Sequence, residues 1–166
     1  MDLFLIRHAI AEERRLDLLD ADRALTDKGR SRFEAVVRSL DRSGYRFDRV
    51  YHSPWLRAAQ TAELLAPIVD GAMISADGLA ERPRPEFFAS LEGEQVACVG
   101  HEPWMSDALS LLTTGDPHGP WLRFKKGGVA WLRGIPHPAS MELRALLPPR
   151  AHVSNRQSRI DHKFTL

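Results

Sequence analysis

The sequence has almost no cysteine and no long hydrophobic run. Cys98 is the only cysteine among 166 residues, which excludes a disulfide within the chain and a metal cluster built on thiolates. Because its neighbours are Ala97 and Val99, we expect Cys98 to be a small buried core residue. No segment contains the roughly 18 consecutive apolar residues that a membrane span needs, so no association with a membrane is expected.

Charge of one sign is also scarce, because the formal net charge is only +1. Nucleic-acid-binding proteins usually carry a strongly basic face, so nucleic acid is not an expected partner. The start of the chain has an acidic Asp2 and no basic stretch before a long apolar run, which is unlike a secretory signal. We therefore expect a cytoplasmic monomer with a single folded domain that binds anions only locally.

Strand and helix patterns alternate along the chain. Short apolar segments predict strands at 3–6, 47–52, 72–75, 95–100, 121–124, 129–132 and 141–147. Apolar spacing and capping residues predict helices from an N-cap at Thr26 to about Gly44, from an N-cap at Ser53 to about Val69, around 86–91, and after Pro103 until Gly115.

This alternation favours an α/β fold with a largely parallel sheet and helices on both faces. Residues 9–25 are charged and lack periodicity, so we expect a loop with little helix that lies over a site. The folded domain is expected at 1–147, followed by a polar, basic surface tail at 148–166.

Residues with chemical function follow three of the predicted strands. Arg7 and His8 follow the first strand, Ser53 and Arg57 follow the second, and His101 follows the strand that contains Cys98. Because binding residues of parallel sheets gather beyond the carboxyl ends of the strands, these side chains are expected to meet at one edge.

Such a group of side chains suits phosphoryl transfer. Arginine presents a planar fork of donors to phosphate oxygens, and an imidazole nitrogen can attack phosphorus in line and form a covalent intermediate. Catalysis of this kind is mostly positioning and electrostatic stabilisation, so neither a metal nor another cofactor is expected.

Four blocks of sequence resemble the histidine phosphatase superfamily, also called the phosphoglycerate mutase-like family, and within it the short SixA-type phosphohistidine phosphatases. The blocks are Leu5-Ile6-Arg7-His8, Leu25-Thr26-Asp27-Lys28-Gly29-Arg30, Ser53-Pro54-Trp55-Leu56-Arg57-Ala58-Ala59-Gln60-Thr61 and Val99-Gly100-His101-Glu102-Pro103. A weaker match covers Lys126-Gly127-Gly128. The order and spacing of these blocks are far more specific than any single block.

The resemblance implies that His8 is the nucleophile and that Arg7, Arg57 and His101 complete a phosphate pocket. It also implies a three-layer α/β/α sandwich in which one edge strand runs antiparallel. The sequence departs from the family pattern at Ala9, where glycine is common.

The general acid is a further expectation from the family. Members that cleave alcohol leaving groups usually carry a carboxyl group between the second-strand block and the His101 block, and Glu81 is the best-placed candidate. The alternatives are Glu86, Glu92 and Glu102. We expect Ser53 to be first a cap and second a neighbour of the pocket.

Two lysines and a tryptophan near the matched blocks allow more than one interpretation. Lys125 and Lys126 either add positive potential near the pocket or decorate a turn. Trp104 is expected to be a core residue rather than a wall of the site.

Three functions remain open from the sequence. The first is hydrolysis of phosphohistidine on a protein, because the chain has few residues between blocks with which to build a lid. The second is a phosphatase of small phosphate esters, such as sugar or nucleotide phosphates, with the same pocket. The third is a catalytically silent phosphate-binding module, against which the presence of a nucleophile argues.

Overall fold

The computed structural model describes residues 1–82, 84–118 and 124–152. The strands are β1 (Asp2–Arg7), β2 (Phe47–His52), β3 (Val69–Ser75), β4 (Gln95–Gly100), β5 (Val129–Gly134) and β6 (Met141–Leu147). The α-helices are α1 (Asp27–Arg42), α2 (Leu56–Glu63), α3 (Pro85–Ala89) and α4 (Trp104–Thr114). Short 3-10 helices are η1 (Asp20–Asp22), η2 (Ala66–Ile68), η3 (Asp77–Leu79) and η4 (Pro149–His152).

The strands form one six-stranded sheet in the order β3-β2-β4-β1-β5-β6. β1, β2, β3 and β4 are parallel, whereas β5 is antiparallel to both of its neighbours, β1 and β6. The predicted α/β class and mostly parallel sheet are confirmed. The expectation that an edge strand runs antiparallel is wrong for this chain, because the hairpin partner β6 covers the far side of β5 and forms the edge itself.

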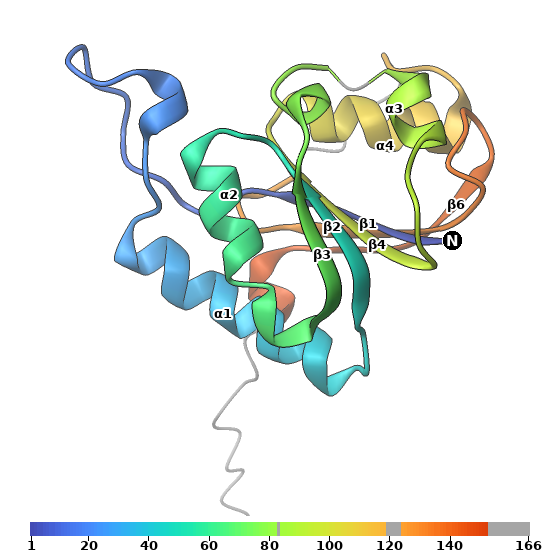
Figure 1. Cartoon of the computed structure of the whole chain (residues 1–166), viewed down its shortest axis with the longest axis horizontal. Coiled ribbons are helices and arrows are strands. Elements are labelled where there is room, and N and C mark those ends of the chain that lie inside the picture. Colours follow the sequence, from blue (N-terminus) through green and yellow to red (C-terminus); the bar gives the residue numbers. More distant parts are fainter. Residues whose placement is uncertain (83, 119–123, 153–166) are drawn as a thin grey trace, which may run out of the picture.

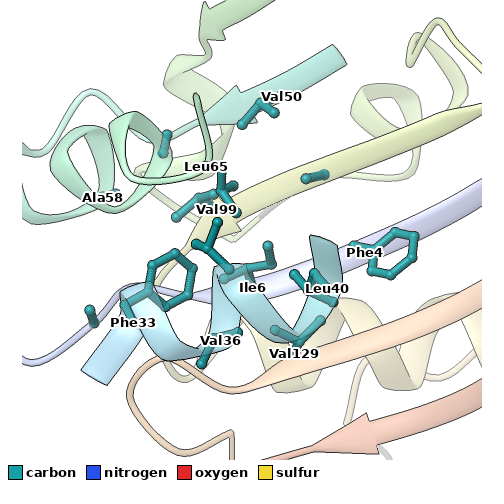
Figure 2. Packing of buried hydrophobic residues seen from close by; sticks show 14 of the residues in the cluster. Phe4, Ile6, Phe33, Val36, Leu40, Val50, Ala58, Leu65, Val99 and Val129 are labelled. Atoms are coloured by element: carbon teal, nitrogen blue, oxygen red, sulfur yellow. The ribbon is translucent and has the colours of Figure 1, made fainter. Parts of the chain in front are cut away.

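Helices cover both faces of the sheet, with α1 and α2 on one face and α3 and α4 on the other (Figure 1). Alternation along β1 explains these layers, because Phe4 and Ile6 pack with α1 and α2, while Leu3 and Leu5 pack with α4. Figure 2 shows the first of these two cores, in which Phe33 of α1 packs near Ile6. As predicted, Cys98 is fully buried, and it belongs to the second core.

Helix α1 begins where the sequence predicts. Thr26 is its N-cap, and the Thr26 hydroxyl accepts a hydrogen bond from the Gly29 backbone N–H and donates one to the Ile10 carbonyl. A side chain at Gly29 would lie 2.0 Å from the carbonyl oxygen of Ile10, so only glycine permits this close approach. The start of α1 is thereby held against the segment that follows His8.

Helix α2 differs from its prediction at both ends. The N-cap is Trp55 rather than Ser53, because the Ser53 hydroxyl accepts a local bond from the Trp55 N–H before the helix starts. The α-helix ends at Glu63 instead of continuing to Val69, because Pro67 has no N–H to donate to the Glu63 carbonyl.

Two predicted segments near the end of the chain extend beyond the described residues. Phe124 lies outside any strand, and the rest of the strand predicted at 121–124 lies outside the described residues. At the end of the domain, Pro149–His152 forms η4 against α1, and residues 153–166 of the predicted tail lie outside the described residues. Within the described ranges, none of the helices combines the length and the apolar character needed to cross a membrane.

Candidate active site

Three neighbouring parallel strands end at the same level, and each is followed by a side chain of the predicted pocket. The His8 N–H donates to the Gly100 carbonyl, at 3.0 Å, and the Ser53 N–H donates to the Val99 carbonyl, also at 3.0 Å. These bonds extend the pairing of β1, β4 and β2 by one residue beyond the sheet. The imidazole rings of His8 and His101 consequently lie 5.2 Å apart between centroids.

His8 is buried and is held in one tautomer. Its Nδ1–H donates to the Ala9 carbonyl at 2.7 Å, because a carbonyl oxygen only accepts. Burial lowers the pKa of His8 to about 2, and the nearby charges of His101, Arg57 and Arg7 act in the same direction. The ring is therefore neutral at physiological pH, with the lone pair on Nε2.

Arg57, in the first turn of α2, lies against that lone pair. Its Nε–H donates to His8 Nε2 at 3.2 Å, and its side chain is only 3% exposed. The same guanidinium forms an ion pair with Asp20 at 3.2 Å and lies 4.6 Å from the ring centroid of Trp55. Asp20 belongs to the loop over the site, as the sequence predicts for residues 9–25.

Two buried nitrogens in the pocket have no hydrogen-bond partner among the described residues. They are Nε of Arg7 and Nδ1 of His101. The Arg7 guanidinium is otherwise anchored by a 2.6 Å bond from Nη1 to the Phe124 carbonyl. Buried polar nitrogens are nearly always hydrogen-bonded in proteins, so these two atoms are exceptions within the described residues.

His101 is held by Ser53 and surrounded by aromatic rings. Its Nε2 hydrogen-bonds to the Ser53 hydroxyl at 2.8 Å, and burial lowers its pKa to about 3, helped by the charge of Arg57. The ring centroids of Trp55 and Trp104 lie 4.6 Å and 6.2 Å from that of His101. Trp104 is half-buried and flanks this site, so its predicted place in the core is wrong.

Several contributors to the site were not found from the sequence. Asp20 lies among many charged loop residues, and no spacing or periodicity distinguished it. Thr61 accepts a hydrogen bond from the Ala9 N–H at 3.0 Å and donates to the Arg57 carbonyl, which joins the His8 segment to α2. Its place in the third matched block was a signal, but its role depends on tertiary contact.

The candidate acids lie apart from these contacts. Glu81 is exposed and lines a shallow surface pocket with Arg82, Arg84 and Pro85, which contains none of the four predicted phosphate-binding residues. Glu86 and Glu92 are also exposed. Glu102 accepts bonds from the Phe124 N–H and the Ser106 hydroxyl, so it supports the segment that anchors Arg7.

Lys126 extends the positive potential of the pocket. Desolvation lowers its pKa, and the charges of Arg7, Arg23 and Arg57 lower it further. Lys126 therefore lies within electrostatic reach of the pocket, which favours the first of the two interpretations that its sequence position allowed.

The chain matches known proteins over most of its length. Residues 3–87 match the model of the histidine phosphatase superfamily (branch 1). An uncharacterized protein of Picosynechococcus sp. is 37% identical over 141 residues, which cover 80% of this chain and 85% of the relative.

Solved structures agree on the fold. The protein histidine phosphatase SixA complexed with tungstate is similar with a TM-score of 0.77 and 19% identity, covering 90% of this chain and 98% of that chain. The Entamoeba histolytica phosphoserine phosphatase in complex with 3-phosphoglyceric acid has a TM-score of 0.65 and 20% identity, covering 92% and 99%. Together with the pocket of His8, Arg7, Arg57 and His101, the family match shows that the chain is a phosphatase belonging to the histidine phosphatase superfamily, branch 1.

Proposed function

We propose that this phosphatase hydrolyses phosphohistidine on a protein through a covalent phospho-His8 intermediate. The observation that carries the proposal is the state of His8, which is neutral and presents the Nε2 lone pair because Nδ1–H is bonded to Ala9. A nucleophilic imidazole needs this tautomer. The similarity to the protein histidine phosphatase SixA supports the substrate class.

Before the reaction, the pocket residues hold the phosphoryl group. Arg57 exchanges its bond to His8 Nε2 for bonds to phosphate oxygens, which frees the lone pair. The unpartnered nitrogens of Arg7 and His101 supply further polar contacts at the charge that develops on the oxygens. Because these donors are buried and already oriented, little reorganisation is needed.

The reaction then follows in two displacements. His8 Nε2 attacks phosphorus, the bond from phosphorus to the substrate nitrogen breaks, and its electron pair leaves with the substrate imidazole. Water next attacks phospho-His8, the new bond from phosphorus to Nε2 breaks, and orthophosphate is released with His8 restored. A substrate imidazole that is protonated on its other nitrogen leaves as a neutral group, so no carboxylic acid is needed. Glu81 is exposed and lies apart from the pocket, which agrees with a mechanism that needs no carboxylic acid.

The test measures phosphate release from a purified histidine phosphotransfer protein that carries phosphohistidine. We expect His8→Ala to abolish release, because the attacking atom is lost. The matched control is His137→Ala, which removes an exposed histidine and is expected to keep wild-type turnover. Labelled phosphate trapped on the wild type after quenching without acid identifies the intermediate. Undiminished turnover by His8→Ala would overturn the mechanism.

A phosphatase of small phosphate esters is the second candidate, and a cavity beside Arg7 favours it. This cavity has a volume of about 490 Å³, within the range of small-molecule sites. A comparison of kcat/KM between the phosphohistidine protein and a panel of sugar and nucleotide phosphates separates the two. A preference for small esters of about tenfold or more, about 1.4 kcal/mol at the transition state, would establish the second candidate instead.

A further inference from the structure

One carboxylate reaches the phosphate pocket from the loop over the site. Asp20 is the first residue of η1, and its side chain accepts hydrogen bonds from Arg57 Nη2 at 3.2 Å and from Arg23 Nε at 2.8 Å. The backbone carbonyl of Asp20 accepts a further bond from Arg57 Nη1. A single residue therefore engages both terminal nitrogens of the Arg57 guanidinium.

These two bonds fix the direction of the Arg57 guanidinium, because its donors lie on a rigid planar fork. With Nη1 and Nη2 held by Asp20, Nε–H points to the other side and donates to His8 Nε2 at 3.2 Å. Among the described residues, no other group bonds to the two terminal nitrogens. Without the carboxylate, only the Asp20 carbonyl would remain to hold that end of the guanidinium.

The loop and α2 together set the position of Asp20. Arg23 donates to the Glu12 carbonyl at 2.6 Å as well as to Asp20, which closes the loop on itself. The Leu25 N–H donates to the side-chain oxygen of Gln60 at 2.7 Å, and η1 contacts α2 (Figure 1). Because Arg57 belongs to the same helix, its distance from Asp20 is set within one local unit.

Asp20 is an ionised carboxylate rather than a proton donor. Burial disfavours its charged form, but the charges of Arg57 and Arg23 outweigh burial and hold the pKa of this carboxyl below its ordinary value. An ionised carboxylate only accepts hydrogen bonds. Its negative charge also repels a phosphoryl group, so Asp20 does not assist phosphate binding through charge.

We propose that Asp20 is a positioning residue for the phosphatase reaction, which holds Nη1 and Nη2 of Arg57 so that Nε faces His8 Nε2 and the phosphoryl group. The carboxylate acts through Arg57 and not on the reacting atoms. Its hydrogen bond favours the transition state by orienting a donor in advance, whereas its charge weakens the binding of anions in the ground state. This role rests on the proposed function in that the phosphoryl group lies between Arg57 and His8.

Two variants separate the hydrogen bond of Asp20 from its charge. Asp20→Ala removes both, whereas Asp20→Asn removes the charge and keeps an oxygen that accepts from Arg57. With p-nitrophenyl phosphate as the substrate, we expect Asp20→Ala to lower kcat about tenfold or more, and about tenfold corresponds to about 1.4 kcal/mol. We expect Asp20→Asn to recover most of this loss. The Kd for tungstate, measured by isothermal titration calorimetry, is expected to be no larger than that of the wild type in both variants.

The matched control is Asp22→Ala, which removes the same charge from an exposed position of the same 3-10 helix. It is expected to keep the wild-type kcat and Kd. If Asp20 only supported the local structure, Asp20→Ala would weaken tungstate binding together with kcat. That result would overturn the proposal, and so would an unchanged kcat in Asp20→Ala.

Arg57 itself supplies a readout that needs no turnover. The Nε–H of a held guanidinium exchanges slowly with water and gives its own signal in a proton–nitrogen correlation spectrum, which Arg57→Lys assigns by its loss. We expect this signal to survive Asp20→Asn and to disappear in Asp20→Ala. A signal that persists in Asp20→Ala would show that the carboxylate does not hold Arg57.

The two proposals fail in different experiments. If His8→Ala hydrolyses phosphohistidine as fast as the wild type while Asp20→Ala loses both kcat and the Arg57 signal, the route through phospho-His8 fails and the role of Asp20 stands. If hydrolysis requires His8 while Asp20→Ala keeps the wild-type kcat and the Arg57 signal, the reverse is true.

Discussion

Burial is the main reason that His8 is neutral, which is the form that the proposed mechanism needs. The side chain is 5% exposed, and the charges of His101, Arg57 and Arg7 disfavour a positive imidazole. A neutral ring with Nδ1–H bonded to Ala9 leaves the lone pair on Nε2, the atom that the proposed mechanism uses for attack. The same arrangement lowers the free energy of unfolding in acid, because the ring resists protonation only while the protein is folded.

These two buried imidazoles make the stability of the protein depend on pH. The unfolded chain protonates His8 and His101 below the ordinary pKa of 6.5, whereas the folded chain protonates them only near about 2 and about 3. Their contribution to stability is therefore complete above pH 6.5 and is lost as the pH falls. We expect His8→Gln to flatten the decline of the free energy of unfolding by up to about 1.4 kcal/mol per pH unit.

The measurement is urea denaturation at several values between about pH 7 and pH 4.5, above the range in which most carboxylates titrate. His137→Gln, at an exposed position, is the control and is expected to keep the wild-type slope. Identical slopes for His8→Gln and the wild type would contradict the assigned state of His8.

Among the elements, the start of α1 has the closest connection to the site. Thr26 caps the helix and also bonds to Ile10, two residues beyond His8. Gly29 lets the helix approach the same loop, because a side chain there would lie 2.0 Å from the Ile10 carbonyl oxygen. The cap therefore contributes both to helix stability and to the position of the segment that follows His8.

We predict that Thr26→Ala lowers the free energy of unfolding by about 1 kcal/mol, because the Gly29 N–H loses its partner. Thr26→Ser restores most of the loss, since serine also caps. Ser31→Ala, at an exposed position within α1, is the control and is expected to change stability little. Urea denaturation checks all three, and an unchanged Thr26→Ala midpoint would show that the cap does not stabilise the helix.

For the whole molecule, the net charge of +1 conceals a strong local imbalance. Arg7, Arg23 and Arg57 gather at one end of the sheet, and Asp20 is the carboxylate that pairs with two of them. A folded protein with such a site is stabilised by any anion that binds only the folded state.

Tungstate or orthophosphate is accordingly expected to raise the Tm. At about one hundred times the Kd, the gain is about 2.7 kcal/mol. Arg57→Gln is expected to lose most of this gain, whereas Arg42→Gln, an exposed change on α1, keeps it. Thermal unfolding with and without the anion measures both, and an equal rise for Arg57→Gln would place the anion elsewhere.

Local sequence alone determined much of the fold. The apolar runs of β1 and β4, the Thr26 cap and the Gly115 end of α4 were all predicted, because burial pattern and backbone preference are local properties. Motif order also placed His8, Arg57 and His101 after the correct strands. Which of these side chains are catalytic stays a prediction until the variants are measured.

Only the tertiary structure decided what surrounds them. The Asp20 carboxylate and the Phe124 carbonyl reach the site as single contacts that no sequence pattern identified. The antiparallel β5 lies inside the sheet because β6 pairs beyond it. The same holds for the cavity beside Arg7, whose lining cations Arg32, Lys126 and Arg150 are far apart in the chain. Sequence patterns report which face of an element is buried, whereas contacts between distant segments depend on how the layers pack.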